Sequence, residues 1–285
     1  MFNLTINSTN VANSLNNMYQ YQFKNGAFED PAGAEMMITS FQIPYRWYNI
    51  TTRYNNNNFK IYWPNGAVGN YTAFTLTLEG GFYTVNAMNA RIQQFCIEKG
   101  MYLTDGSGNN IYYLSVSPNS TAYANQIITK LVPLVVTGYT QPSNFAGYPT
   151  TTQRPPYVEI LSTNNFGKFL GFSAGTYGKD QIANYNVLSN LIPQGSTVNS
   201  LVVKCSLCNN GCSNQSDTID SFAIGGASSG GTFGGNLNYT NNIEKWVRIS
   251  EGRFNNFIVT IVDQNNNDIT ILDNNLLINF LIRVK

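Results

Sequence analysis

Apolar and polar residues alternate along much of the chain, which is the pattern of strands that bury one face and expose the other. In the first part of the chain the alternation runs through 19–23, 36–43, 59–63 and 74–78. Five more segments with this period follow residue 197, namely VNSLVVKCSL, SDTIDSFAI, EKWVRISE, RFNNFIVTIVD and NNLLINFLIRVK. Turns rich in Pro, Gly and Asn separate them. Many short strands with frequent turns predict a β-sandwich or a jelly roll.

One segment has the period of a helix instead. Thr84 is a suitable N-cap residue, and Gly100 stands where a glycine commonly follows the end of a helix. The apolar residues between them recur at helical spacing: Val85, Met88, Ile92, Phe95 and Cys96. We therefore predict a short amphipathic helix here, followed by a hairpin in which MYLTD and IYYLSVS pair around GSGNN.

The chain is long for one eight-stranded sandwich, so an insertion is expected. The pattern changes between about residues 80 and 197, which hold the helix and an extended Pro-rich loop at 138–156. We predict an all-β fold, a single jelly-roll β-sandwich with an inserted, mostly β domain containing one short helix. The expected ranges are 1–17 for an N-terminal arm, 18–80 and 198–285 for the jelly roll, and 81–197 for the inserted domain. The closing segment IVDQNNNDITILDNNLLINFLI is expected to pair two strands around its Asn-rich middle.

Charge is scarce and balanced. There are 16 Lys+Arg and 15 Asp+Glu, and charged residues make up 11% of the chain, against about 25% in an ordinary soluble protein. The chain has no histidine, which excludes a His-based triad, a His-ligated metal and an imidazole base. It also lacks the basic surface of a nucleic-acid-binding protein. Its 42 asparagines predict a polar, uncharged surface that suits packing against neighbouring copies. The alternative is that an AT-rich coding sequence raises the number of Asn, Ile, Tyr and Phe residues.

The four cysteines are Cys96, Cys205, Cys208 and Cys212. The segment CSLCNNGC has the C-x-x-C spacing of a zinc half-site, but no second half-site accompanies it. Cys205 falls on the apolar face of a strand and Cys96 on the apolar stripe of the helix, so both are expected to be small core residues. The pattern favours free, structural thiols formed in a reducing compartment, with a disulfide or a zinc site as the alternatives.

Paired carboxylates of the glycosidase kind are the one enzymatic chemistry that this composition leaves open. Glu29, Asp30 and Glu35 lie near one another in sequence, as do Asp217 and Asp220. Roles in turns and at strand ends explain all five residues without catalysis. We therefore predict that the protein is not an enzyme and has no catalytic residues.

Binding sites for ions or cofactors are not expected either. Asp263, Asp268 and Asp273 recur every five residues, a spacing too wide for a calcium loop and typical of turn caps. The loop GGASSGGTFGG lacks the lysine and the following helix of a phosphate-binding loop. No apolar run approaches the length of a membrane helix, and MFNLTINSTNVANSLNN lacks the features of a secretory signal.

Six segments share a recognisable spacing of aromatic residues, Asn and Gly. They are SFQIPYRWYNITTRYNNNNFKIYW, GGFYTVNAMNARIQQFCIEKGMYL, GNNIYYLSV, FGKFLGFSAGTYG, VNSLVVKCSLCNN and FIVTIVDQNNNDITILDNNLLINFLIRV. In this order they are similar to the minor capsid (penton) proteins of virophages and polinton-like viruses. The resemblance runs from about Met18 to the C-terminus and includes no catalytic signature.

The resemblance implies a structural protein of an icosahedral double-stranded DNA virus. Five copies of a single jelly roll would surround each five-fold vertex, beside trimers of a double-jelly-roll major capsid protein, after assembly inside the host cell. In relatives the jelly roll can carry an inserted outer domain, a role that 81–197 fits. The alternative is a virion-surface attachment or carbohydrate-binding β-sandwich module, in which the 18 Tyr and 3 Trp would supply stacking surfaces.

Overall fold

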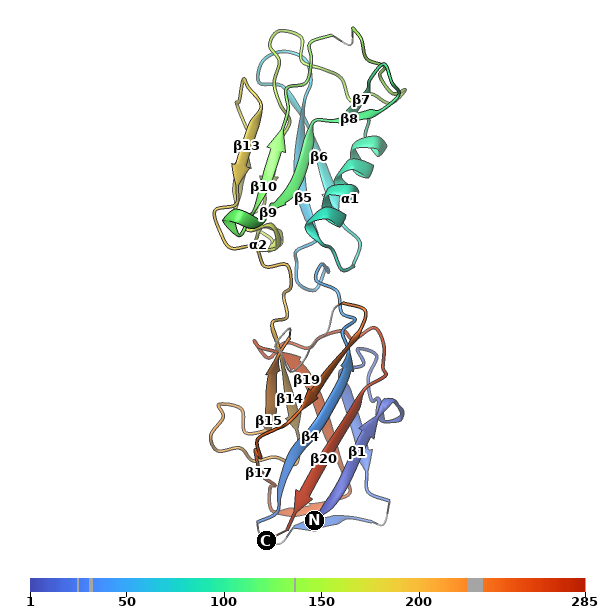
Figure 1. Cartoon of the computed structure of the whole chain (residues 1–285), viewed down its shortest axis with the longest axis vertical. Coiled ribbons are helices and arrows are strands. Elements are labelled where there is room, and N and C mark those ends of the chain that lie inside the picture. Colours follow the sequence, from blue (N-terminus) through green and yellow to red (C-terminus); the bar gives the residue numbers. More distant parts are fainter. Residues whose placement is uncertain (25, 31–32, 136, 225–232, 285) are drawn as a thin grey trace. The chain divides into compact units, whose positions relative to one another are not determined.

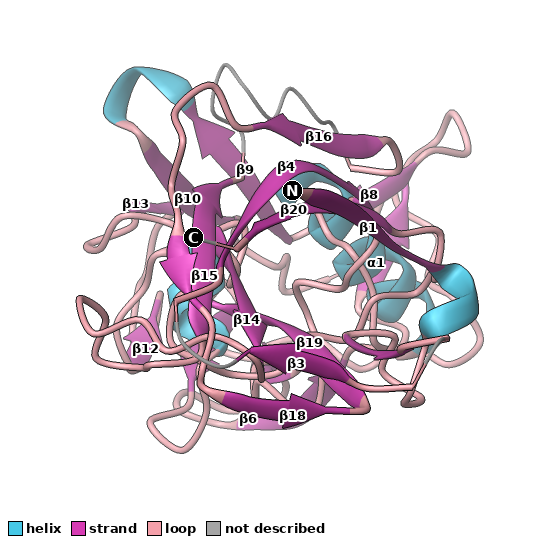
Figure 2. Ribbon diagram, turned by 90° about the horizontal axis from the view of Figure 1, so that it is seen from below, coloured by secondary structure: helices cyan, strands magenta, loops and turns pink. Residues whose placement is uncertain are grey.

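The chain folds into two compact units, each with its own hydrophobic core (Figure 1). Unit 1 combines Met1–Trp47 and Val198–Lys285, and unit 2 is the intervening segment Tyr48–Thr197. Strands and loops make up most of the molecule, and helix is confined to a few short segments (Figure 2). The computed structural model describes residues 1–24, 26–30, 33–135, 137–224 and 233–284.

Unit 1 is a sandwich of two antiparallel sheets. The first contains, in order, β1 (Phe2–Asn7), β20 (Leu277–Arg283), β4 (Glu35–Pro44) and β16 (Asn236–Thr240). The second contains, in order, β15 (Thr218–Ala223), β14 (Ser200–Cys205), β19 (Asn256–Asp263) and β2 (Met18–Gln22). Three short strands complete the unit, with β17 (Val247–Arg248) paired to β4, and β3 (Phe28–Asp30) paired to β18 (Gly252–Phe254).

The order of these strands is that of a jelly roll. When the eight main strands are lettered B to I along the chain, the first sheet reads B-I-D-G and the second reads C-H-E-F. All of their pairings are antiparallel. The predicted fold class is thus confirmed, and unit 2 is inserted between the D strand β4 and the E strand β14.

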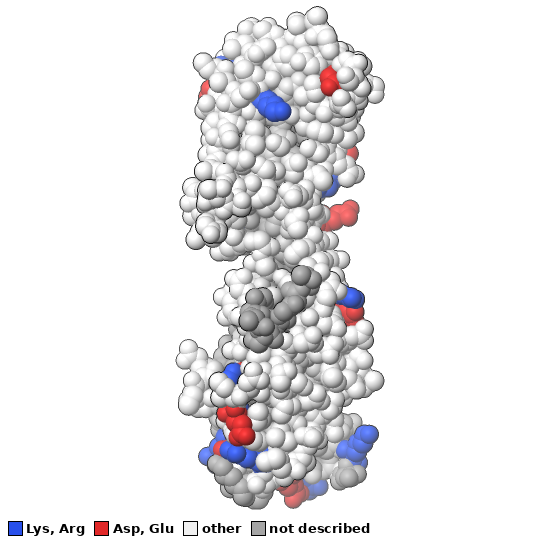
Figure 3. All heavy atoms as spheres, in the orientation of Figure 1, with Lys and Arg blue, Asp and Glu red and all other residues white. Residues whose placement is uncertain are grey.

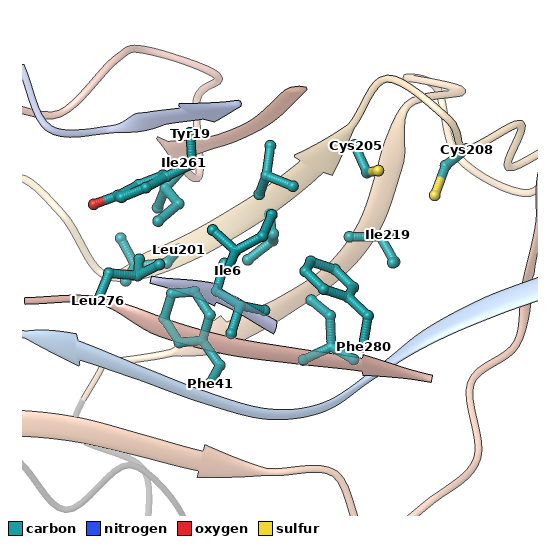
Figure 4. Close-up of a cluster of buried hydrophobic side chains, with 14 of the residues drawn as sticks. Ile6, Tyr19, Phe41, Leu201, Cys205, Cys208, Ile219, Ile261, Leu276 and Phe280 are labelled. Carbon is teal, nitrogen blue, oxygen red and sulfur yellow. The ribbon is translucent and has the colours of Figure 1, made fainter. Parts of the chain in front are cut away.

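Apolar side chains that point inward from both sheets hold this sandwich together (Figure 4). In β20, Ile278, Phe280 and Ile282 are fully buried, whereas the residues between them are not. Phe257 of the second sheet meets Phe280 edge to face, with ring centroids 6.3 Å apart. Since burying such a side chain contributes about 1.5–3 kcal/mol, this core is the main source of the stability of unit 1.

Two predictions about unit 1 are wrong. Residues 1–17 are not only an arm, because β1 pairs with β20 and buries Leu4 and Ile6. The apolar residues of β1 do alternate, but the Asn, Ser and Thr residues around them conceal the pattern. The closing segment does not pair its own two strands either, because β19 belongs to the second sheet and β20 to the first.

Unit 2 contains a four-stranded and a three-stranded antiparallel sheet. The larger sheet contains, in order, β12 (Gly175–Tyr177), β11 (Tyr157–Ile160), β5 (Asn58–Pro64) and β6 (Tyr71–Thr77). The smaller one contains, in order, β13 (Tyr185–Leu188), β10 (Ala124–Thr129) and β9 (Leu114–Asn119). The predicted hairpin is confirmed and consists of β7 (Tyr102–Thr104) and β8 (Asn110–Tyr112).

The predicted helix is present as α1 (Val85–Glu98), with the expected residues at both ends. Thr84 caps its N-terminus through the side-chain oxygen, and Gly100 follows its C-terminus with a φ of +67°. A Cβ atom at Gly100 would also clash with the carbonyl oxygen of Asn144, so this position requires glycine. A second helix, α2 (Phe166–Leu170), was not predicted because five residues are too few to show a helical period.

The first boundary between the units differs from the predicted one. The sequence placed it near residue 80, but the chain enters unit 2 at Tyr48, so β5 and β6 belong to unit 2 and not to the jelly roll. The apolar residues of β5 alternate just as those of a jelly-roll strand do, and alternation does not reveal which core receives them. The chain returns to unit 1 at Val198.

Buried asparagines form hydrogen bonds between the segments through which the chain enters and leaves unit 2. We call this part of the unit its base. Asn49 is 1% exposed, and its Nδ2 donates hydrogen bonds to the carbonyl oxygens of Tyr83 at 2.8 Å and Gly195 at 2.6 Å. Its Oδ1 accepts a bond from the N–H of Tyr83 at 2.8 Å. Asn56 Nδ2 donates in turn to the carbonyl oxygen of Asn49 at 2.8 Å. One side chain therefore joins three segments that are distant in sequence.

Candidate functional site

The outer face of the first jelly-roll sheet combines amide and hydroxyl side chains with apolar ones such as Leu277, which is 38% exposed. Thr5 Oγ1 donates a hydrogen bond to Asn279 Oδ1 at 2.8 Å, and Asn279 Nδ2 donates one to Ser40 Oγ at 2.8 Å, so a polar ladder links β1, β20 and β4. Within the four main strands of this sheet, the charged residues are Glu35 and Arg283, which pair with each other at 2.7 Å. The other residues of these four strands are uncharged, whereas Arg248 of the short strand β17 in the same sheet is exposed and pairs with Glu251 at 2.8 Å.

The outer face of the second sheet also carries few charges, and the apolar Ile258 of β19 is exposed on it beside polar residues. Gln20 and Ser221 are exposed on it, and Thr260 is half-buried. Lys204 is its one cationic strand residue and lies 3.1 Å from Asp217. Another protein can cover either face without burying an unpaired charge, which is the costly step in forming an interface.

A shallow hollow of about 400 Å³ lies beside β17 in unit 1. Its walls come from the start of β4, from the connection after β14 and from the residues around β17. They are Glu35, Asn209, Asn210, Gly211, Cys212, Trp246, Val247 and Arg248. On the face drawn in Figure 3, most charged atoms of unit 1 lie toward the end of that unit that carries the chain termini.

The sequence does not reveal this hollow, because its walls come from segments that are far apart in sequence. One signal was present in the segment EKWVRISE. Val247 and Ile249 are the buried residues of its alternation, which leaves Trp246 on the outward phase, where a tryptophan is unusual. A tryptophan on the outward phase, directly before the strand β17, is the feature that could have indicated a surface site.

The cysteines occupy three kinds of environment. Cys96 and Cys205 are buried in the two cores, as predicted, Cys208 is also buried, and Cys212 is exposed. Cys205 Sγ lies 3.9 Å from Met36 Sδ, and Figure 4 shows Cys208 beside Cys205. A hydrogen bond with Cys205, and then burial, raise the pKa of the Cys208 thiol, and burial raises the pKa of Cys96 to about 12. Because the thiolate is the reactive form, these two thiols are expected to be inert at neutral pH.

We therefore expect iodoacetamide at neutral pH to modify Cys212 in the native protein and to spare Cys96, Cys205 and Cys208. Peptide mass spectrometry before and after unfolding in urea measures this, with C212S as the control that should show no modification when native. Native modification of Cys208 as fast as Cys212 would contradict the buried position. A Cys205–Cys208 disulfide in freshly purified protein would establish the disulfide alternative.

Four of the five carboxylates considered for enzymatic chemistry have separate ion-pair partners. The pairs are Glu29–Arg253 at 3.3 Å, Glu35–Arg283 at 2.7 Å, Asp217–Lys204 at 3.1 Å and Asp220–Lys245 at 2.9 Å. Asp30 ends β3, and its side chain is outside the described part of the chain. Of the two hollows described in unit 1, one is lined by Glu35, and neither is lined by two of these residues.

The regularly spaced aspartates act in local structure. Asp263 Oδ1 accepts hydrogen bonds of 2.8 Å from two backbone N–H groups of the turn that follows, and Asp273 Oδ1 accepts one of 3.0 Å, so both cap turns as predicted. Asp268 instead accepts a bond from Asn17 Nδ2 at 3.1 Å. Within the described ranges, no three His, Cys, Asp or Glu side chains are grouped to hold a metal ion. Most of the glycine-rich loop, residues 225–232, lies outside the described residues.

Comparison with known proteins gives matches at the level of structure. No family model matches the sequence, and no curated protein matches it. The chain is similar to the crystal structure of the mavirus penton protein, with 11% identity and a TM-score of 0.47 over 99% of this chain and 97% of that one. It is also similar to a chain in the cryo-EM structure of the Sputnik virophage, with 12% identity and a TM-score of 0.38 over 93% of this chain and 91% of that one. The assignment of unit 1 as a jelly roll rests on its strand order alone.

No helix in the part of the chain that the structure describes is long and apolar enough to cross a membrane.

Proposed function

We propose that the protein is a structural capsid protein and that it forms the pentameric vertex of an icosahedral double-stranded DNA virus. The observation that carries the proposal is the B-I-D-G and C-H-E-F jelly roll with a second domain inserted between its D and E strands. The specific role, that of a penton at the five-fold vertex, is inferred from the six sequence segments that resemble the virophage and polinton-like penton family. The partners in this proposal are four further copies of the chain and a double-jelly-roll major capsid protein.

The chemistry of the outer sheet faces supports this role. A closed ring of identical subunits uses two different surfaces of each copy, and both surfaces must lose water when the ring forms. Amide and hydroxyl groups that already bond to one another, such as those of Thr5, Asn279 and Ser40, lose water at less cost than unpaired charges. A structural role without catalysis also agrees with the separate ion-pair partners of the candidate carboxylates.

Unit 2 has a distinct part in this proposal. It has its own core, and both of its connections enter the jelly roll between the same two strands. An insertion of this kind can vary without disturbing the sheets that carry it. We assign unit 2 the role of an outer domain, with the jelly roll held in the shell of the virion.

The purified protein is expected to sediment as a pentamer of the 31.6 kDa chain, and to join shells when it is co-expressed with the major capsid protein. Since the outer faces are nearly uncharged, the pentamer should persist between about 0.1 M and 1 M salt, where exposed charge pairs are screened. Analytical ultracentrifugation and electron microscopy of the shells measure these outcomes. A species that stays monomeric at all concentrations and is never recovered in shells would contradict the proposal.

Charge substitutions on the two outer faces sharpen this test. Asn238→Lys lies on the first sheet and Thr260→Lys on the second, and at least one of them is expected to weaken pentamer formation by burying a charge. Gln181→Lys adds the same charge at an exposed residue of unit 2, which is not part of either jelly-roll sheet, and serves as the control. Full assembly of both sheet variants would show that neither face is a contact surface.

A further inference from the structure

The hollow beside β17 combines an aromatic wall with amide, carboxylate and guanidinium walls. Trp246, directly before β17, forms the aromatic wall. Asn209 and Asn210, from the connection after β14, supply the amide groups, and Glu35 and Arg248 supply the charged groups. Its volume of about 400 Å³ is within the usual range of small-ligand sites, about 300–1,000 Å³. Apolar and hydrogen-bonding groups thus meet in one open depression on the jelly roll.

The indole of Trp246 is held in place by its neighbours. Its Nε1 donates a hydrogen bond to Glu244 Oε2 at 2.8 Å, and the guanidinium of Arg283 lies 4.0 Å from the ring centroid. Arg283 is fixed in turn by Glu35, with Nη2 2.7 Å and Nε 2.8 Å from Oε2. Because Arg283 covers one face of the indole, a ligand would stack on the other face, and a ring fixed in this way loses little conformational freedom on binding.

The charges around the hollow are compensated within the protein. Arg283 pairs with Glu35 at 2.7 Å, and Arg248 pairs with Glu251 at 2.8 Å. An anionic ligand would have to compete with these carboxylates for the guanidinium groups. A neutral ligand with many hydroxyl groups would instead accept and donate hydrogen bonds to groups that stay paired.

A saccharide satisfies both requirements, because one side of a sugar ring presents C–H groups to an aromatic face and its edge presents hydroxyls. We propose that this hollow is a binding site for a neutral saccharide, with Trp246 as the stacking residue and Asn209, Arg248 and Glu35 as the hydroxyl-binding residues. The proposal does not rest on the capsid role, although the hollow lies at one edge of the outer face of the first sheet, where β17 pairs with β4.

The test measures binding of neutral saccharides to the full-length protein. A glycan array is used first, followed by saturation-transfer NMR with methyl glucoside, methyl galactoside and N-acetylglucosamine. Trp246→Ala is expected to weaken binding by at least about tenfold, as loss of an aromatic contact residue commonly does, and Asn209→Ala should weaken it less. Tyr123→Ala removes another aromatic ring, 86% exposed in unit 2, and should leave binding unchanged.

Labelling Cys212 of the wild-type protein with a bulky maleimide gives a second test that leaves the folded chain intact. Cys212 is exposed and lines the hollow, so the label should block binding. Absence of binding to any neutral glycan on the array would overturn the proposal, and so would binding that survives both Trp246→Ala and the label. Loss of pentamers in Trp246→Ala without any glycan binding would assign the hollow to a subunit interface and also overturn the saccharide site.

Discussion

Replacing Phe280 with alanine is expected to lower the free energy of unfolding of unit 1 by about 3–5 kcal/mol, the usual cost of deleting a buried aromatic ring. Phe280 is completely buried on the inward side of β20, the I strand, which lies between β1 and β4 in the first sheet. Its ring meets Phe257 of the opposite sheet at 6.3 Å, so the substitution opens a cavity between the two sheets. A loss of this size is a large part of the stability of a typical domain, about 5–15 kcal/mol.

Hydrogen exchange at increasing urea concentrations measures the effect, because it reports on the peptides of each unit separately. Leu277→Ala is the matched control, since Leu277 is on the same strand but faces outward and is 38% exposed. It should cost less than about 1 kcal/mol. The two cores share no residue, so unit 2 should keep its own transition. An equal effect of the two substitutions, or an equal shift of unit 2, would contradict the division into separate cores.

The strands of the fold were largely visible in the sequence, but their partners were not. Alternation identified β14, β15, β19 and β20, because one side of each must be buried. It could not show that β19 and β20 lie in opposite sheets, since an Asn-rich connection fits a hairpin and a crossing between sheets equally well. Pairing depends on contacts between distant segments, which periodicity does not contain.

The predicted boundary between the two units is wrong for a related reason. Strand β5 has the alternation of a jelly-roll strand, yet Phe59 and Trp63 are buried in the core of unit 2. The residue that marks the true boundary in the structure is Asn49, two residues after Trp47, which is the last residue of the first part of unit 1. A buried asparagine looks like any other of the 42 in the sequence until its partners at Tyr83 and Gly195 are known.

The candidate surface sites were predicted less well than the core. Cys96 and Cys205 lie in the two cores, as predicted, because the periodicity of the helix and of the strand that contain them shows which residues are buried. The hollow beside Trp246 instead depends on how Glu35 and Asn209 come together from separate strands and loops. Sites of this kind are created by the topology, so they emerge only once the strand order is known.

Asn49→Ala is expected to destabilise unit 2 by about 2–4 kcal/mol, because buried polar groups lose their hydrogen-bond partners. The substitution leaves the carbonyl oxygens of Tyr83 and Gly195 and the N–H of Tyr83 without the side chain that now bonds to them. These groups lie at the base of the unit, where Asn49 is 1% exposed. Hydrogen exchange in urea should show an earlier transition for unit 2 and an unchanged one for unit 1.

Two further variants separate hydrogen bonding from packing at this position. Asn49→Asp keeps the size of the side chain but replaces its two donated bonds with contacts between a carboxylate and two carbonyl oxygens, so it should destabilise unit 2 at neutral pH at least as much as alanine does. Asn70→Ala removes an exposed asparagine from the same unit and should have little effect. An Asn49→Asp variant as stable as the wild type would contradict this explanation. It would show that the hydrogen bonds donated by Asn49 do not stabilise unit 2 and that packing around this side chain does.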